Sequence, residues 1–150
     1  MGLQEKISIR PFQEKDALPV SALIKETLFT VNNKDYPRGE LEEIAERYSP
    51  DHLVKFARSK TIFVATVERR PVGTASIEHD YISCVFVAPS YIGKGVGRKL
   101  MDAVEDDAVQ RGIRRVRLDS SVTARRFYEQ RGYEADVVQL GTIAMHKDLI

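Results

Sequence analysis

The sequence has little of what several protein classes require. Among 150 residues it has one cysteine, Cys84, which can form neither an internal disulfide nor a cysteine-rich zinc site. Its apolar surroundings predict a buried structural thiol. No apolar run approaches the ~20 residues that a membrane span needs. The 23 basic and 22 acidic side chains leave a net charge of +1, which argues against a partner that is nucleic acid or membrane.

The chain also shows no sign of internal division, because it has no repeat, low-complexity run or linker rich in Gly, Ser or Pro. With 43% apolar residues it is too hydrophobic for a disordered protein, and its length fits one compact domain over residues 1–150. Glu5, Lys6 and Arg10 stand where a signal peptide would carry its apolar segment. We therefore expect a single-domain protein of the cytoplasm.

The period of the apolar pattern predicts a mixed α/β domain with one central sheet. A strand over residues 7–10 precedes a helix over 14–30, a loop over 31–39 and one or two short helices over 40–57, interrupted at Ser49-Pro50. The second half predicts strands over 61–67, 72–77 and 81–87, a helix over 97–111, a strand over 116–118, a helix ended by Gly132, and two strands within 133–147.

A glycine-rich loop between a predicted strand and an amphipathic helix gives the clearest functional signal. Gly93, Gly95 and Gly97 allow positive φ and let the backbone approach a ligand closely. Unpaired amides at the helix start suit a phosphate, and Lys94 and Arg98 add positive charge. An ordinary glycine turn that caps a helix would show the same pattern. The spacing matches neither the P-loop nor the dinucleotide fingerprint Gly-x-Gly-x-x-Gly.

Two motifs in this half of the chain are more specific together than either one alone. Val87-x-Pro89 followed by Gly93-Lys-Gly-Val-Gly97 resembles the acetyl-CoA signature of the Gcn5-related N-acetyltransferase (GNAT) family. About thirty residues later, Ser121-Val-Thr-Ala-Arg-Arg-Phe-Tyr128-Glu-Gln-Arg-Gly-Tyr133 resembles the second signature of that family. The chain departs from the pattern at Ile92, where Gln or Arg is usual, and at Ser121, where Asn is common.

This resemblance implies a single-domain GNAT-like fold, a central, mostly antiparallel sheet of about seven strands flanked by about four helices. It implies transfer of the acetyl group of acetyl-CoA, as cosubstrate, to a primary amine, with the amide of Val87 stabilising the tetrahedral oxyanion. The implied cofactor-binding residues are Val85, Phe86, Val87, Gly93, Lys94, Gly95, Val96, Gly97, Arg98, Ser121 and Tyr128.

The sequence predicts which groups would donate or accept protons in this reaction, but it leaves alternatives open for each. Tyr128 matches the general acid of the family, although a core aromatic at this helical position would look the same. An alkyl amine with a pKa of ~10.4 is neutral in only about one molecule in 2,500 at pH 7, so a base or a water path is needed. Glu78 and Asp119, near predicted strand ends, are the candidate bases, and a water relay serves equally. Tyr81 stands where some relatives carry a catalytic glutamate.

No motif specifies the acceptor, which is expected to be a small-molecule or peptide amine. The family shapes its acceptor site from the region that corresponds to residues 25–58. Acidic residues there suit a cationic amine, although a solvated helix would carry the same charges. With only three widely spaced histidines, no metal is expected. A homodimer stays open, as does a rival function, a non-catalytic acyl-CoA-binding sensor or interaction module.

Overall fold

The computed structural model describes residues 6–139 and 141–150. The α-helices of this part are α1 (Ala17–Thr30), α2 (Arg38–Arg47), α3 (Pro50–Phe56), α4 (Val96–Gln110) and α5 (Arg125–Gln130). The strands are β1 (Ile7–Pro11), β2 (Thr61–Val67), β3 (Arg70–Glu78), β4 (Tyr81–Val87), β5 (Arg115–Ser121), β6 (Glu134–Gln139) and β7 (Thr142–Asp148). Two 3₁₀ turns, η1 and η2, span Glu14–Asp16 and Pro89–Tyr91.

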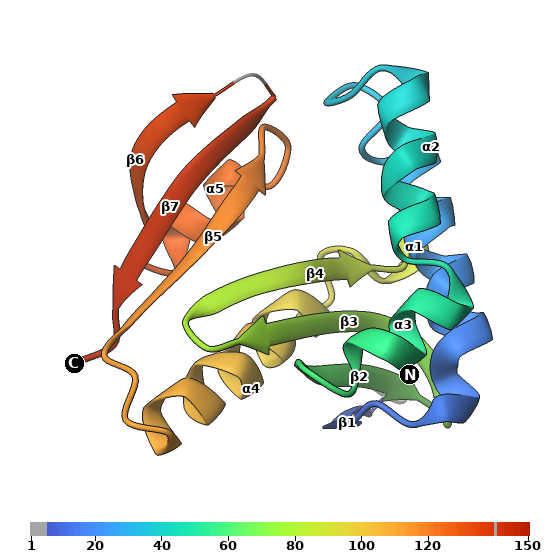
Figure 1. Ribbon diagram of the computed structural model, residues 1–150, viewed down its shortest axis with the longest axis horizontal. Helices are drawn as coiled ribbons and strands as arrows, with labels where there is room; N and C mark the ends of the chain where they lie inside the picture. Colours follow the sequence, from blue (N-terminus) through green and yellow to red (C-terminus); the bar gives the residue numbers. More distant parts are fainter. Residues whose placement is uncertain (1–5, 140) are drawn as a thin grey trace, which may run out of the picture.

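The strands form one seven-stranded sheet in the order β1-β2-β3-β4-β5-β7-β6 (Figure 1). Neighbouring strands are antiparallel except for β4 and β5, which run parallel. The predicted mixed, mostly antiparallel sheet is therefore confirmed. No helix in the described ranges is long and apolar enough to cross a membrane.

The helices also follow the sequence prediction, which left open whether residues 40–57 form one helix or two. About four were expected, and the described residues form five α-helices because α2 and α3 are separate. The Ser49 hydroxyl accepts a hydrogen bond from the backbone N–H of His52 at 3.4 Å, and Pro50 begins α3. Proline lacks the N–H that would continue α2 and is well placed at the first position of a helix.

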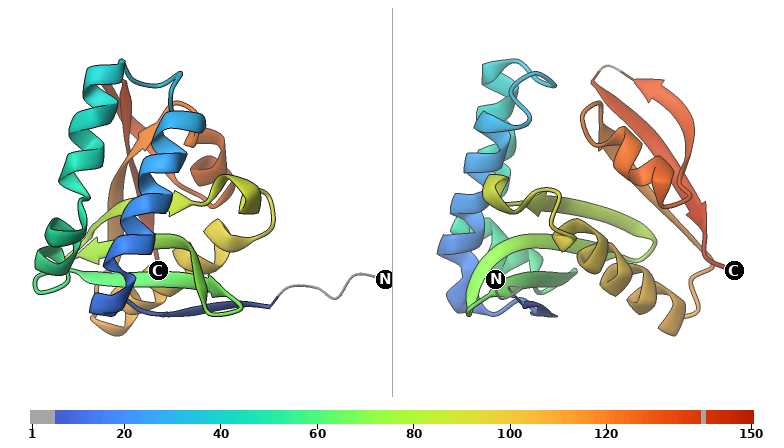
Figure 2. Two further views of the ribbon diagram at one scale, coloured as in Figure 1. Left: turned by 90° about the vertical axis from the view of Figure 1, so that its right-hand side faces the viewer. Right: turned by 180° about the vertical axis from the view of Figure 1, so that it is seen from behind.

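Helices cover both faces of the sheet (Figures 1 and 2). On β2, Val64 belongs to the apolar cluster formed with α1, α2 and α3, while Ala65 and Val67 belong to the cluster formed with α4. This division follows from the alternation of side chains along a strand. Tyr128 of α5 joins the α4 cluster. The first three helices and α4 therefore lie on opposite faces.

The sheet opens in the middle, where β4 and β5 diverge. These strands pair only through Tyr81 with Arg117 and Ile82 with Leu118, and beyond these residues they separate into a V (Figure 1). All other neighbouring strands stay paired over five or more positions. The V leaves one edge of β4 without a partner strand for most of its length.

A β-bulge in β4 accompanies the divergence. Between Thr74 and Ser76 the register of β3 and β4 shifts, so that Ala75 faces both Cys84 and Val85. Cys84 has a φ of 55°, which is unusual for a residue other than glycine. Bulges bend the strand that carries them, which accounts for the turn of β4 away from β5. The Cys84 thiol is buried, as predicted, and burial raises its pKa to about 12.

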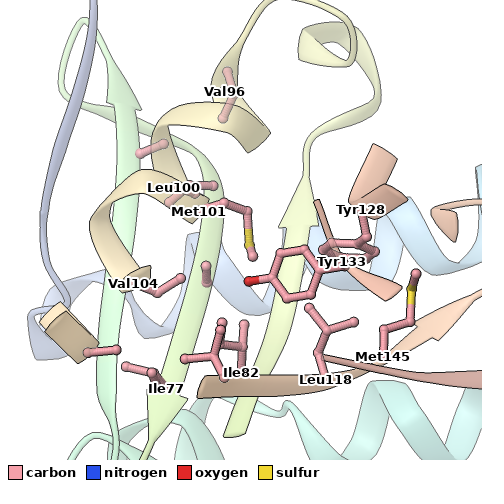
Figure 3. Packing of buried hydrophobic residues seen from close by; sticks show 14 of the residues in the cluster. Ile77, Ile82, Val96, Leu100, Met101, Val104, Leu118, Tyr128, Tyr133 and Met145 are labelled. Carbon is pink, nitrogen blue, oxygen red and sulfur yellow. The ribbon is translucent and has the colours of Figure 1, made fainter. Parts of the chain in front are cut away.

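A buried ionic cluster joins α4 to the C-terminal half across this opening. The carboxylate of Glu105, a residue only 8% exposed, lies 2.8 Å from Nζ of Lys147 and 3.1 Å from a guanidinium nitrogen of Arg131. It also accepts a hydrogen bond from the Tyr133 hydroxyl at 2.9 Å. In Figure 3 this hydroxyl points toward α4, beside Met101. The cluster therefore supplements the short β4–β5 pairing.

Replacing Glu105 by Gln is expected to lower the free energy of unfolding by about 1–3 kcal/mol, because a neutral amide leaves Arg131 and Lys147 without their buried counter-charge. Urea denaturation measures the change. Asp102→Asn is the matched control, since it removes an exposed carboxylate that contacts the same arginine at 3.0 Å and should cost less than about 1 kcal/mol. Equal losses in the two variants would contradict a special role for Glu105.

Candidate active site

The diverging strands border a cleft of about 980 Å³. Because α2 and α4 lie on opposite faces of the sheet and residues from both ends of the opening line it, the cleft passes from one face to the other. Nearly all of the predicted cofactor-binding residues line it: Val85, Phe86, Val87, Gly93, Lys94, Gly95, Gly97, Arg98, Ser121 and Tyr128. The side chain of Val96 does not, because it is buried in the core.

The packing of Val96 fixes the start of α4 against the sheet. A Cβ atom on Gly73 of β3 would lie 2.8 Å from Val96 Cγ1 and 3.0 Å from Leu100 Cδ1. Only glycine therefore allows α4 to approach β3 this closely. Val96 can take part in ligand binding through its backbone N–H, while its side chain is structural.

The glycine loop presents a set of free backbone donors. Among the described residues, none accepts a backbone-to-backbone hydrogen bond from the N–H groups of Gly93, Gly95, Val96, Gly97 or Arg98. Gly95 precedes α4 with a φ of 89°, in the left-handed region that favours glycine. The positive end of the helix dipole adds to the attraction of these amides for an anion. The arrangement suits a phosphate or pyrophosphate.

The edge of β4 beside this loop is open to the cleft. The N–H of Ala88 donates to the carbonyl of Val72 on β3 at 2.8 Å. Since the backbone groups of successive strand residues point to alternate sides, the N–H of Val87 points away from β3, toward the opening. The carbonyl of Val87 accepts a hydrogen bond from Thr27 Oγ1 at 3.1 Å. The amide predicted to stabilise an oxyanion therefore lies at the open edge.

Tyr128 brings a hydroxyl group to the same cleft. Its ring is buried, 6% exposed, and packs edge-on against Phe127 and Tyr133 with centroids 5.1 and 5.6 Å away. Among the described residues, every fully buried side-chain oxygen has a hydrogen-bond partner. The Tyr128 hydroxyl has no such partner in this part of the chain, so it is not fully buried and is in reach of solvent in the cleft. Burial raises the pKa of Tyr128, which keeps the phenol protonated.

The two positions that depart from the family pattern have different surroundings. The Ser121 hydroxyl accepts a hydrogen bond from the N–H of Ala124 at 3.2 Å, at the start of α5, and it lines the cleft. Ile92 is half exposed at the mouth of the cleft. Backbone amides, rather than these side chains, provide most of the polar surface for an anion here.

The other end of the cleft is acidic. Glu40 and Glu43 of α2 and Asp119 of β5 line it, and Arg47 is the one cation there among the described residues. Burial raises the pKa of Tyr36, and the nearby charges of Asp35, Glu40 and Asp119 raise it further. The loop end carries Lys94 and Arg98 instead. The cleft thus has a positive end on the α4 face and a negative end on the α2 face.

The candidate bases lie in different places. Asp119 lines the cleft and accepts a hydrogen bond from the Tyr81 hydroxyl at 2.6 Å. Glu78 lies outside the cleft, at the rim of a second, shallow hollow near the turn between β3 and β4. Within the described residues, no group of three His, Cys, Asp or Glu side chains is arranged to hold a metal ion.

The loop between α1 and α2 spans the top of the opening. Asp35 accepts hydrogen bonds from the N–H of Thr123 at 3.1 Å and from its hydroxyl at 2.9 Å. Asn32 donates to the other carboxylate oxygen of Asp35 at 2.9 Å. These bonds tie the α1–α2 loop to the β5–α5 loop and narrow the acidic end.

Comparison with known proteins agrees with this geometry. The family model described as an acetyltransferase (GNAT) domain matches residues 32–140. The chain belongs to the GNAT acetyltransferase family. It is 28% identical over 129 residues to the uncharacterized N-acetyltransferase YafP of Escherichia coli (strain K12), covering 85% of this chain and 81% of that protein.

Solved GNAT structures share the fold over nearly the whole chain. A GCN5-related N-acetyltransferase from Rhodopseudomonas palustris superposes with a TM-score of 0.89 at 26% identity and covers 99% of both chains. The PaiA N-acetyltransferase from Thermoplasma acidophilum, solved in complex with coenzyme A, gives a TM-score of 0.86 at 20% identity and covers 95% of this chain and 99% of its own.

Some contacts between residues of this GNAT cleft carried no signal in the sequence. Thr27 lies in the last turn of α1 and donates a hydrogen bond to the carbonyl of Val87, 60 positions later in the chain. Tyr81 is a partner of Asp119 only through the parallel pairing of β4 with β5. The contact of Asp35 with Thr123 joins loops 88 positions apart. Long-range pairings of this kind become visible only in three dimensions.

Proposed function

We propose that the protein is an N-acetyltransferase that moves the acetyl group of acetyl-CoA to the primary amine of a small cationic acceptor by direct attack on the thioester. One observation carries the proposal: free amides before α4, the open edge of β4 and the Tyr128 hydroxyl share a single cleft. If these residues of the GNAT cleft served only to pack the core, there would be no reason for the three groups to meet in one cleft.

Each group has a chemical task in this reaction. The amides from Gly93 to Arg98 hold the pyrophosphate of acetyl-CoA at the start of α4. The N–H of Val87 donates to the oxyanion that forms when the amine attacks the thioester carbonyl. Tyr128 stabilises the sulfur as the carbon–sulfur bond breaks.

Tyr128 is expected to donate a hydrogen bond to the departing thiolate and not to transfer its proton completely. A free phenol, with a pKa of ~10, is already a weaker acid than a thiol, at ~8.5. Burial raises the pKa of Tyr128 further. A raised pKa disfavours the phenolate, while a desolvated phenol remains a good hydrogen-bond donor to a charged sulfur.

The acceptor class follows from the charges and the loop at the far end. Glu40, Glu43 and Asp119 outnumber Arg47 there, which favours a cation over a neutral or anionic amine. The bridge between Asp35 and Thr123 narrows the same end, which favours a small molecule over a folded protein.

Three amines with four carbon atoms each test the acceptor class. We expect kcat/KM to fall from 1,4-diaminobutane to butylamine to 4-aminobutanoate, by roughly 2–5-fold at each step, because the far end goes from positive to neutral to negative and a partly exposed ion pair is worth ~0.5–1 kcal/mol. Thiol release from acetyl-CoA measures the rate. The differences should shrink at high salt. Equal rates, or a preference for the anionic amine, would contradict a cationic acceptor.

A further inference from the structure

Helices α4 and α5 lie on different arms of the V. Helix α4 packs against β1 to β4, whereas α5, which carries Tyr128, lies with β5 to β7 (Figure 1). The sheet itself joins the two arms only through the two residue pairs between β4 and β5. The position of the Tyr128 hydroxyl relative to the free amides at the start of α4 therefore depends on how α5 is held against α4.

Arg131, the residue that follows α5, reaches α4 with its guanidinium. Its side chain is only 13% exposed. Nη1 donates to the carbonyl of Arg98 at 3.4 Å, Nη2 to the carboxylate of Asp102 at 3.0 Å, and Nε to Oε2 of Glu105 at 3.3 Å. These three residues are spaced so that they share one face of α4. The planar guanidinium, with five donors in a fixed arrangement, contacts all three at once.

The backbone of Arg131 is joined directly to that of Tyr128. The N–H of Arg131 donates to the carbonyl of Tyr128 at 3.0 Å, and the N–H of Tyr133 donates to the same carbonyl at 3.0 Å. Burial raises the pKa of Tyr128, and the nearby positive charge of Arg131 lowers it. A movement of Arg131 along α4 would therefore move Tyr128 as well.

Phe127 makes a second contact between α5 and the start of α4. A Cβ atom on Gly97 would lie 3.2 Å from Phe127 Cζ, so this ring rests on the backbone of the first turn. The ring also lines the cleft, where it can touch a ligand, whereas Arg131 is not among the described residues that line it. Arg131 can thus act on the reaction without touching a ligand.

We infer that Arg131 is a positioning residue for the acetyl transfer, because its guanidinium fixes α5 against α4 and so holds the Tyr128 hydroxyl in place relative to the amides that bind the phosphates. This inference rests on the proposed function and assigns the residue that sets its geometry. Helix α4 is the common reference, since its first amides hold the cofactor and its side holds Arg131. A shift of about 1 Å between reacting groups is enough to cost about 100-fold in rate.

The test compares the wild type with Arg131→Met, Tyr128→Phe and the double variant, using acetyl-CoA and 1,4-diaminobutane. Arg131→Met keeps a long side chain beside α4 and removes all of its donors. It should lower kcat by about 10–30-fold and keep the Kd of acetyl-CoA within about threefold, because the amides of the loop remain. Since Arg131 acts through Tyr128, the double variant should be less than about twofold slower than Tyr128→Phe alone.

Two further variants separate positioning from a loss of stability. Lys147→Met removes another cation from the same carboxylate, 2.8 Å from Glu105 Oε1, but from β7 rather than from the end of α5. It should lower the midpoint of urea denaturation about as much as Arg131→Met and leave kcat within about twofold of the wild type. Arg131→Lys keeps the charge beside Glu105, but one ammonium cannot bond to Arg98, Asp102 and Glu105 together. It should be more stable than Arg131→Met and still lower kcat about fivefold.

The inference is overturned if Arg131→Met keeps the wild-type kcat, if it lowers kcat by the same factor with and without the Tyr128 hydroxyl, or if Lys147→Met lowers kcat as much. Any of these results with an active wild type would leave the proposed function intact. A wild type that transfers no acetyl group to any amine would overturn the proposed function and this inference with it.

Discussion

Replacing Tyr128 by Phe is expected to lower kcat by about 10²–10⁴-fold, the usual worth of a positioned acid or hydrogen-bond donor at a leaving group. The ring keeps its packing against Phe127 and Tyr133, and only the hydroxyl that reaches the cleft is lost. The affinity for acetyl-CoA should change little, because one neutral hydrogen bond contributes only ~0.5–1.5 kcal/mol. Single-turnover rates and the Kd of acetyl-CoA give the two quantities.

Tyr133→Phe is the matched control for this loss. It removes a phenol hydroxyl from the neighbouring ring, but that hydroxyl bonds to Glu105 and does not reach the cleft. It should lower stability by about 1 kcal/mol and leave kcat within a few fold of the wild type. If Tyr128→Phe behaved like Tyr133→Phe, Tyr128 would be a packing residue and sulfur would take its proton from water.

Gly95→Val is expected to weaken acetyl-CoA binding by about 100-fold or more. The φ of Gly95 is 89°, in the left-handed region that a β-branched residue avoids, so the loop must change shape to accept valine. A changed loop no longer directs its free amides to one point, and the phosphate loses several charge-assisted hydrogen bonds at once. Isothermal titration with acetyl-CoA measures the affinity.

Gly112→Val distinguishes loss of the site from general strain. Gly112 follows the far end of α4 with a φ of 79°, and a Cβ atom there would meet nothing within 4 Å. The two substitutions therefore impose the same kind of backbone strain at opposite ends of one helix. Gly112→Val should lower stability and keep the affinity for acetyl-CoA, whereas a similar loss of affinity in both variants would show that the loop is not the binding site.

The sequence predicted the fold well where local signals dominate. The strands over 61–67 and 81–87 have the predicted bounds, and the helix expected over 97–111 lies one residue earlier at each end. The alternation of apolar residues in a strand, the end of a helix at glycine and the break of a helix before proline all depend on residues that are neighbours in the sequence. The strand expected over 116–118 runs from Arg115 to Ser121 because its exposed charged residues alternate with a buried face, which a search for apolar runs does not detect.

The site was predictable only in part, because its geometry depends on tertiary pairing. The loop residues were identified through two motifs, and ten of the eleven predicted cofactor-binding residues line the cleft. The side chain of the eleventh, Val96, packs toward Gly73 instead, a contact between distant segments, and leaves only the backbone N–H for a ligand. The sequence ranked Glu78 with Asp119, but Glu78 ends β3 and lies outside the cleft, while Asp119 of β5 lines it.

The most direct measurement of the central claim is the product itself. The wild-type protein is incubated with acetyl-CoA carrying a ¹³C-labelled acetyl group and with 1,4-diaminobutane, and the amine is analysed by mass spectrometry while free thiol is counted. We expect labelled N-acetyl-diaminobutane and free thiol in equal amounts, with both lost in Gly95→Val. Tight binding of acetyl-CoA without labelled amide from any amine of the series would contradict the account and would assign the cleft to a cofactor-binding module.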